Sequence, residues 1–327
     1  MTRILPVTDP DAVRDAAAAL RRGSLVAFPT ETVYGLGADA RNAEAVARIF
    51  AVKRRPAFDP LIVHLADERD LERVAASRPE GLRKLADRFW PGPLTVVVPK
   101  HPAIPDIVTA GLETVAVRIP EPEPTRRWLA ACGTPVAAPS ANPFGYVSPT
   151  TAAHVADQLG GELELILDGG PCPVGLESTV VTLVTNPPAI LRTGGISVEA
   201  VRDVLGEVRI LPPGTPASVR PDSPGQLSRH YATKTPLVIL DASQVPPAGS
   251  CRVGLLGYRE APARHGYASV ELLAPEGDME TAAAGLFAAL RRLDALGLDL
   301  IVAEPVPERG LGLAIMDRLR RCAASSP

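Results

Sequence analysis

Residues 28–37 read FPTETVYGLG and decide how the rest of the chain is interpreted. They follow the apolar run at 25–28, which predicts a short buried strand. The composition then changes at once to hydroxyls, a carboxylate, a phenol and two glycines. Polar side chains directly after a buried strand indicate a binding pocket, because ligands in α/β proteins bind at strand ends. We therefore expect this segment to turn into the wall of a functional site.

The composition is that of an ordinary globular protein. A chain of 327 residues exceeds the usual size of a single core, so two domains are expected. Hydrophobic residues make up 46% and charged residues 22%, and a net charge of -3 gives no strong field for nucleic acid, without excluding it. No stretch has the character of a signal peptide or a membrane span. We expect neither export nor a membrane contact.

The cysteines point to a reducing compartment. They show none of the spacings that mark a zinc site, a redox pair or a disulfide framework. The four positions are Cys132, Cys172, Cys251 and Cys322. A cytoplasmic protein without a metal centre is the expectation.

The first 210 residues alternate predicted helices and strands. A helix is expected at 11–22, where apolar positions repeat with helical spacing and Gly23 follows as a stop. Asn42 is placed to cap a second helix, whose C-terminal end delivers Lys53 and Arg55. Short β-branched runs predict further strands at 61–65, 94–99, 115–119, 136–138, 165–167, 179–184 and 189–191. This alternation predicts an α/β domain at 1–210 with an open, twisted, mixed sheet.

The pattern breaks at residue 211. Residues 211–236 are rich in proline, which disfavours helix and central strand and predicts a linker. Because long irregular segments in compact proteins tend to be lids, we expect this linker to close over the ligand. Beyond it, runs at 237–240, 253–256, 269–273 and 300–303 predict strands, and 279–295 and 311–320 predict helices. A smaller Rossmann-like domain at 237–327 is expected.

Phosphate recognition in this chain would have to rest on side chains. There is no G-x-x-x-x-G-K-[ST] motif, and the G-x-G-x-x-A match that begins at Gly35 lies too far from a strand end and a helix start. The candidate cations are Lys53, Arg55, Arg118 and Arg192. A Lys-Arg-Arg run is often a solvated helix end. Here Pro56 and the strand that ends in His64 follow it, which favours a functional role.

Three further positions are ambiguous when each is taken alone. His64 ends an apolar strand, where a single histidine is more often structural than catalytic, and no other histidine has ligand spacing to it. Ser140 and Asn142 lie in a proline-flanked segment that fits an ordinary turn equally well. Neither Ser140 nor Ser178 lies in a G-x-S-x-G elbow, so an acyl-serine mechanism is not expected.

The joint order of these motifs resembles the L-threonylcarbamoyladenylate synthases, the YrdC-like family. The family is marked by a Lys-x-Arg pair and a distant Ser-x-Asn pair, which match residues 53–55 and 140–142. Similar segments continue at 114–120, 177–181 and 191–194, and 223–232 resembles the linker of two-domain members. The resemblance covers nearly the whole chain.

The resemblance implies synthesis of threonylcarbamoyl-adenylate from L-threonine, bicarbonate and ATP, with release of pyrophosphate and with Mg²⁺ bound through ATP. A threonylcarbamoyl transferase would then pass the product to adenosine beside the anticodon of certain tRNAs. The residues implied to hold threonine are Thr32, His64, Arg118, Ser178 and the backbone of Ala138. Those implied to hold ATP are Arg55, Asp59, Thr114, Ser140, Asn142, Ser148, Arg192 and Tyr231. The implied catalytic residues are Lys53, Arg55 and Tyr231.

Two departures and two alternatives accompany this resemblance. Arg54 stands where the family usually has glycine, and Asp59 stands where it usually has asparagine. A carboxylate beside a nucleotide is unfavourable unless it turns to the ribose or to magnesium.

One alternative is a carbamoyl-transfer enzyme of hydrogenase maturation, whose acylphosphatase and zinc-finger signals the sequence does not show. The other is a double-stranded RNA-binding or ribosome-assembly protein, for which the net charge predicts only weak binding.

Overall fold

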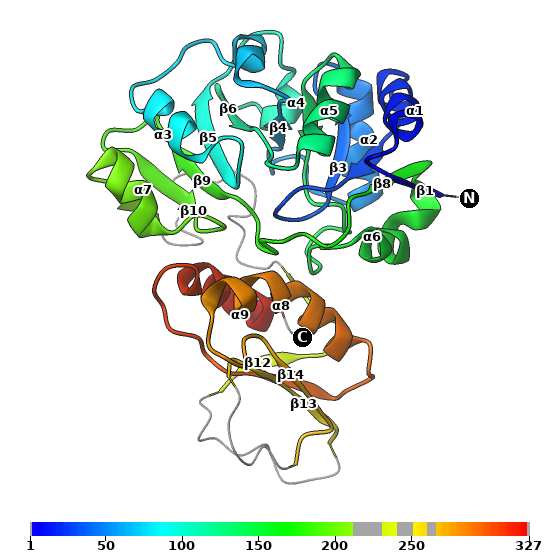
Figure 1. The fold of residues 1–327 in the computed structure, drawn as a ribbon, viewed down its shortest axis with the longest axis vertical. Coiled ribbons are helices and arrows are strands. Elements are labelled where there is room, and N and C mark those ends of the chain that lie inside the picture. Colours follow the sequence, from blue (N-terminus) through cyan, green and yellow to red (C-terminus); the bar gives the residue numbers. More distant parts are fainter. Residues whose placement is uncertain (1, 212–230, 241–250, 260–265, 326–327) are drawn as a thin grey trace.

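The computed structural model describes residues 2–211, 231–240, 251–259 and 266–325, which form two α/β units (Figure 1). Most of the predicted lid at 211–236 therefore lies outside the described residues, and its closure stays a prediction. Within the described ranges, no helix has the length and apolar character needed to cross a membrane.

The larger unit is built on one mixed sheet. In the described part of the chain its eleven strands follow the order β1-β8-β2-β3-β7-β4-β6-β5-β9-β10-β11. They are β1 (Arg3–Pro6), β2 (Val26–Phe28), β3 (Gly35–Asp39), β4 (Ile62–His64), β5 (Leu94–Pro99), β6 (Thr114–Arg118), β7 (Val136–Ala138), β8 (Leu165–Asp168), β9 (Thr179–Thr182), β10 (Ala189–Arg192) and β11 (Arg209–Ile210). β4 pairs parallel with β6 and antiparallel with β7. The predicted mixed α/β fold is confirmed.

Helices pack on both faces of this sheet. They are α1 (Pro10–Arg21), α2 (Ala43–Lys53), η1 (Glu68–Arg73), α3 (Leu82–Phe89), α4 (Asp106–Thr109), α5 (Glu123–Cys132), α6 (Ala152–Leu159), η2 (Gly160–Glu162) and α7 (Val198–Leu205). Val26 and Phe28 of β2 belong to the apolar cluster formed with α1 and α5. Ala27, between them, belongs to the cluster that contains residues of α2. Successive strand residues face opposite sides, so one sheet separates two cores.

β3 is a strand that the sequence analysis does not predict, because residues 28–37 were expected to form the wall of the site. The structure ends the turn at residue 34 and continues as a strand beside β2. A Cβ at Gly35 would lie 2.8 Å from Cζ of Phe28, and a Cβ at Gly37 would lie 2.9 Å from Cγ1 of Val136. Neighbouring side chains fill this space, so the strand needs glycine at both positions.

The helix α2 has the ends that the sequence predicts. Asn42 Oδ1 accepts from the amides of Glu44 and Ala45, both at 3.1 Å. After Lys53 the chain turns at Arg54, whose φ of 53° lies in the left-handed region. Glycine takes this region without a steric cost, which explains why the resembled family prefers it here. Arg54 therefore carries about 1 kcal/mol of backbone strain.

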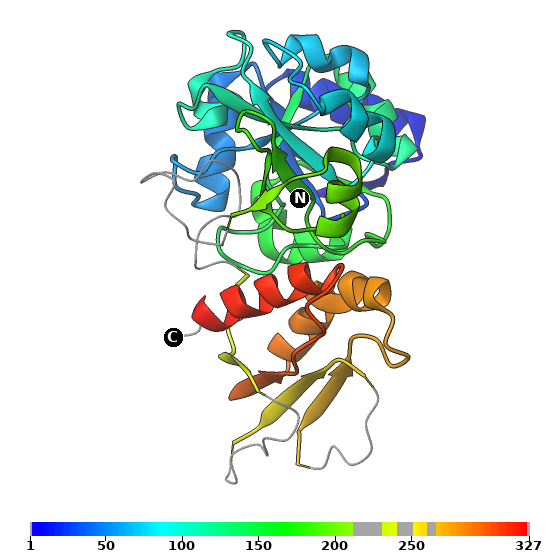
Figure 2. The ribbon, with the colours of Figure 1, turned by 90° about the vertical axis from the view of Figure 1, so that its left-hand side faces the viewer.

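The second unit is a parallel sheet with two helices on one face. In the described residues its strands follow the order β12-β15-β13-β14. Its elements are β12 (Leu237–Ile239), β13 (Val253–Gly257), β14 (Ser269–Leu272), α8 (Met279–Asp294), β15 (Leu300–Ala303) and α9 (Gly312–Ser325). Figures 1 and 2 show α8 and α9 between the small sheet and the large unit. The helices thus form the surface that docks onto the large unit.

The contact between the units combines apolar packing with hydrogen bonds. Val33, Val147 and Leu176 of the large unit belong to the apolar cluster of α8 and α9. Arg291 of α8 donates to Gln158 Oε1 at 2.8 Å and to the carbonyl of Val147. The second unit therefore packs directly against residues near the predicted site.

Candidate active site

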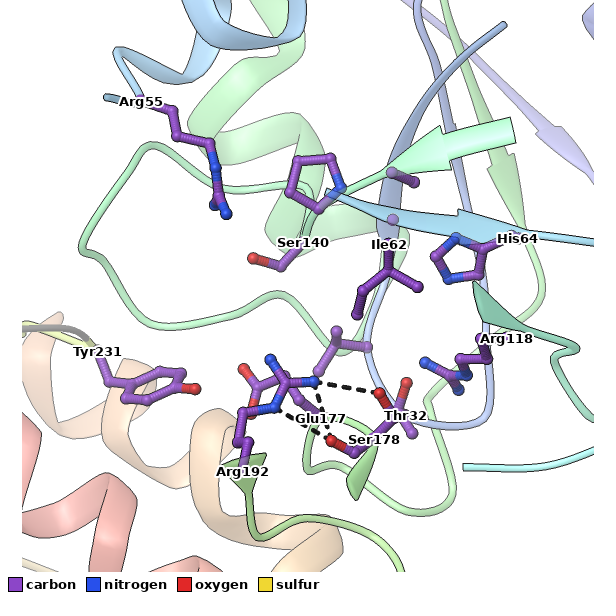
Figure 3. A pocket seen from close by; sticks show the side chains of 14 residues that line it. Thr32, Arg55, Ile62, His64, Arg118, Ser140, Glu177, Ser178, Arg192 and Tyr231 are labelled. Carbon is purple, nitrogen blue, oxygen red and sulfur yellow. Dashed lines mark hydrogen bonds between the residues drawn. The ribbon is translucent and has the colours of Figure 1, made fainter. Parts of the chain in front are cut away.

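One pocket gathers most of the polar side chains that the sequence singles out (Figure 3). Its walls come from the loop after β2, the turn after α2, the strands β4, β6 and β7, and the segments beside β9 and β10. The lining residues are Thr32, Val33, Gly35, Arg55, Ile62, His64, Arg118, Ala138, Pro139, Ser140, Glu177, Ser178, Arg192 and Tyr231. Segments that are distant in sequence therefore meet at one candidate active site.

Strand register brings the floor of the pocket together. His64 lies opposite Arg118 on β6 and opposite Val136 on β7, and Ile62 lies opposite Ala138. Residues two apart on a strand share a face, so Ile62 and His64 both face the pocket. Because β4 has a hydrogen-bonded neighbour on each side, this floor is rigidly supported.

The loop after β2 presents Thr32 through hydrogen bonds centred on Thr30. Thr30 Oγ1 donates to the carbonyl of Val33 at 2.7 Å and accepts from the amide of Thr32 at 3.1 Å. The hydroxyl oxygens of Thr30 and Thr32 are 2.8 Å apart. Local side-chain bonds of this kind fix a turn, so the hydroxyl of Thr32 is held at the pocket wall.

Arg118 is a buried cation that is fixed on one side only. Its Nη2 lies 2.8 Å from Oε1 of Glu31, and both side chains are buried. The other oxygen of Glu31 accepts from the amide of Glu121 at 3.1 Å. Among the described residues, Nε of Arg118 has no hydrogen-bond partner. An arginine with spare N–H groups in a pocket is suited to an anionic ligand such as a carboxylate.

His64 is neutral in the pocket. Burial lowers its pKa from the usual 6.5 to about 3, and the charge of Arg118 acts in the same direction. Its ring meets the ring of Phe28 edge-on, with centroids 5.5 Å apart. A neutral imidazole can exchange hydrogen bonds with a ligand but contributes no charge.

Arg192 and Ser178 are linked at the far wall. Nε and Nη2 of Arg192 donate to the carbonyl of Ser178 at 3.1 and 2.9 Å, and Nη2 donates to its hydroxyl at 3.1 Å (Figure 3). That hydroxyl is 2.7 Å from Oγ1 of Thr95. Burial lowers the pKa of Arg192 to about 10, which leaves it charged at neutral pH.

Arg55 and Asp59 form a buried ion pair. Nη2 of Arg55 lies 2.8 Å from Oδ2 of Asp59, and the same guanidinium donates to the carbonyls of Asp59 and Pro60 at 3.1 and 2.9 Å. Burial raises the pKa of Asp59, and Arg55 opposes that rise. The carboxylate that departs from the family pattern therefore faces an arginine inside the protein.

Lys53 and Asn142 lie behind the pocket. Nζ of Lys53 donates to the carbonyls of Ser140, at 2.5 Å, and Asn142. Nδ2 of Asn142 donates to the carbonyls of Pro143 and Tyr146, both at 2.8 Å. Burial lowers the pKa of Lys53 well below its usual value. Both side chains shape the segment that presents Ser140, and their closeness to phosphates stays a prediction.

Tyr231 closes the pocket toward the second unit. Its ring stacks on Phe287 of α8, with centroids 5.4 Å apart. Burial raises its pKa to about 12, so the phenol is protonated at neutral pH. Its φ of 66° is in the left-handed region, which is rare for a tyrosine and occurs where the surrounding structure enforces it.

The structure separates the predicted residues into three groups. Those that line the pocket are Thr32, Arg55, His64, Arg118, Ala138, Ser140, Ser178, Arg192 and Tyr231. Those that contact a lining residue from behind are Lys53, Asp59 and Ser148, and Asn142 lies one step further back, where its carbonyl accepts from Lys53. Thr114 begins β6 opposite Pro99 and does not line this pocket.

The sequence did not identify several lining residues. They are Val33, Gly35, Ile62, Pro139 and Glu177. The first four line the pocket through backbone or apolar atoms and carry no chemical signature. Glu177 precedes Ser178 directly, but nothing nearby in the sequence names a partner for its carboxylate.

The described residues do not form a magnesium cage. No group of three or more His, Cys, Asp or Glu side chains in the described ranges could hold a metal ion. Three carboxylates beside the pocket are already paired, Asp59 with Arg55, Glu31 with Arg118 and Glu177 with Arg318. A divalent ion would find few free protein oxygens here.

Comparisons with known proteins agree on one family. Residues 18–194 match the family described as Telomere recombination, and 196–324 match Threonylcarbamoyl-AMP synthase, C-terminal domain. The chain is 44% identical to the threonylcarbamoyl-AMP synthase of Pyrococcus abyssi, over 95% of this chain and 94% of the relative. Identity to the enzyme of that name from Bacillus subtilis is 43%, over 99% and 96%. A crystal structure of P. abyssi Sua5 complexed with L-threonine matches with a TM-score of 0.91 and 41% identity, over 99% of this chain and 98% of that one.

Proposed function

The chain belongs to the threonylcarbamoyl-AMP synthase family, and we propose that it joins L-threonine, bicarbonate and ATP into threonylcarbamoyl-AMP and releases pyrophosphate. One observation carries this proposal: a single pocket combines a partly free buried arginine beside a neutral histidine with two further buried arginines, Arg55 and Arg192. The first pair suits an amino acid, and the second suits phosphates.

At the amino-acid end, Arg118 holds the threonine carboxylate with its spare N–H groups. Thr32 and Ser178 exchange hydrogen bonds with the amine and the hydroxyl, together with the backbone of Ala138. Neutral His64 adds no positive charge beside the amine. The charge of Arg118, which already lowers the pKa of His64, also favours the deprotonated amine. The neutral amine forms the C–N bond of the carbamate, either with carbon dioxide and loss of a proton or with bicarbonate and loss of water.

At the nucleotide end, the carbamate oxygen attacks the α-phosphorus of ATP and pyrophosphate leaves in line. Negative charge builds on the phosphoryl oxygens during this step. Arg55 and Arg192 are fixed by hydrogen bonds before ATP binds, so they stabilise that charge without reorganisation; each such donor contributes about 3 kcal/mol. Ser140 and Tyr231 complete the nucleotide site, with Ser148 and Thr114 as further predicted contacts. No side-chain nucleophile is required.

We also propose that Mg²⁺ enters with ATP as part of the substrate, since the described carboxylates beside the pocket are paired with arginines. The product is a reactive mixed anhydride that a transferase would consume for tRNA modification. Weak RNA binding remains the alternative function, and a steep salt dependence of RNA affinity would support it.

The proposal is tested by pyrophosphate release from MgATP. We expect release only when threonine and bicarbonate are both present. Arg192→Met should lower the rate by about 100-fold, whereas Arg202→Met, at an exposed position on α7, should not change it. Pyrophosphate or phosphate release that does not depend on threonine would contradict the proposal.

A further inference from the structure

An arginine of the second unit reaches the wall of the pocket. Arg318 lies on α9 and is completely buried. Its Nε and Nη2 donate to Oε2 of Glu177 at 3.1 and 3.0 Å. Its Nη1 donates to the carbonyl of Thr193 at 2.6 Å and to Oδ2 of Asp317 at 3.0 Å. The main contacts of this side chain are therefore made with the large unit.

Glu177 is the acidic residue of an otherwise cationic pocket. Its Oε1 accepts from the hydroxyl of Ser148 at 2.7 Å, and its Oε2 faces Arg318. A carboxylate beside a triphosphate repels it unless a cation neutralises it at close range. Arg318 supplies that cation from behind the pocket wall, where it does not occupy space needed by a ligand.

The same arginine supports Tyr231. The guanidinium carbon of Arg318 lies 5.5 Å from the centre of the Tyr231 ring, and the ring of Phe287 stacks on Tyr231 as well. Two elements of the second unit, α8 and α9, therefore hold the aromatic side chain that closes the pocket.

We propose that Arg318 is a positioning residue for the nucleotide: the second unit makes the pocket competent for ATP by neutralising Glu177 and holding Tyr231 through this side chain. The inference rests on the proposed function. It gives the second unit a role in nucleotide affinity that is separate from docking, and it predicts that threonine recognition at Arg118 and Thr32 is affected much less.

The test compares KM for ATP, KM for threonine and kcat in four variants, with the melting temperature of each. Arg318→Met should raise KM for ATP by about tenfold or more and KM for threonine by less than about threefold, because it removes the cation that faces the Glu177 carboxylate beside the nucleotide. In the double variant, Arg318→Met combined with Glu177→Gln, the logarithm of KM for ATP should return at least half of the way to the wild-type value. Glu177→Gln alone completes the double-mutant cycle.

Arg291→Met is the matched control, since Arg291 contacts backbone carbonyls and Gln158 of the large unit but not Glu177. It should lower the melting temperature without changing the ratio of the two KM values. If Arg318→Met folds poorly, Arg318→Gln and Arg318→Gln combined with Glu177→Gln carry the same comparison. Equal rises in both KM values, or no recovery in the double variant, would overturn the inference. An inactive wild-type enzyme would instead overturn the proposed function.

Discussion

Replacing Arg55 with Met should damage activity and stability by two separable routes. Arg55 lines the pocket and, in the proposed reaction, faces the phosphoryl group. It is also the partner of Asp59, at 2.8 Å, with side-chain exposures of 4% and 0%. The substitution therefore removes a donor from the nucleotide site and leaves a carboxylate buried without its cation.

The two losses have different expected sizes. A preorganised donor to developing charge is worth about 3 kcal/mol, so kcat/KM for ATP should fall by a factor on the order of 100. Breaking a buried ion pair costs about 3–5 kcal/mol of unfolding free energy. Adding Asp59→Asn, the amide usual in the family, removes the unpaired carboxylate. Stability should then return to within about 1.5 kcal/mol of the wild type, while activity stays low.

Urea unfolding and steady-state kinetics on the wild type, Arg55→Met, Asp59→Asn and the double variant separate these routes. Asp59→Asn should restore stability in the Arg55→Met background and leave the rate constant unrestored. Recovery of both quantities together would show that Arg55 acts only by pairing with Asp59. An active Arg55→Met enzyme would refute the phosphate role.

Four further results are expected. Threonine should be favoured over serine by about 10- to 100-fold, since serine loses the burial of one methyl group, and valine should react more slowly still; equal rates in competition assays would indicate a general carbamoylating enzyme. As pH drops from 6.5 toward 3, the unfolding free energy should fall more steeply in the wild type than in His64→Gln, by up to about 1.4 kcal/mol per pH unit. The reason is that His64 binds a proton in the unfolded state in this range but not in the folded state. Parallel curves for the two proteins would contradict the neutral histidine. Arg54→Gly should be at least as stable as the wild type and Arg54→Val less stable by about 1 kcal/mol in urea titrations, and equal stabilities would argue against strain at this φ. Tyr231→Phe should lower the yield of product without changing the melting temperature, and full activity would leave the phenol without a role.

The sequence predicted the elements well where hydrophobic period and capping agree. Helix α2 begins directly after Asn42, as the capping pattern predicts. The strands β4 to β10 coincide with the predicted β-branched runs. β3 was not predicted because its alternate glycines disfavour a strand locally. Packing of Gly35 and Gly37 against Phe28 and Val136 overrides that preference.

The candidate site was predictable in its residue types and less so in their orientation. The motifs identified Lys53 and Arg55 as a pair, but only the left-handed turn at Arg54 and the surrounding backbone show that Lys53 points behind the pocket. The role proposed for Glu177 depends on its contact with Arg318, which lies 141 positions later in the chain. Contacts across such a separation arise from the packing of two units, which no local pattern encodes.

The most direct measurement follows an isotope from bicarbonate into the product. The purified protein is incubated with L-threonine, MgATP and ¹³C-bicarbonate, and the mixture is separated rapidly for mass spectrometry. We expect threonylcarbamoyl-AMP that carries the ¹³C label, formed in equal amount to pyrophosphate and absent when threonine is omitted. Pyrophosphate with AMP but without a labelled adduct under conditions that preserve an added standard would contradict it.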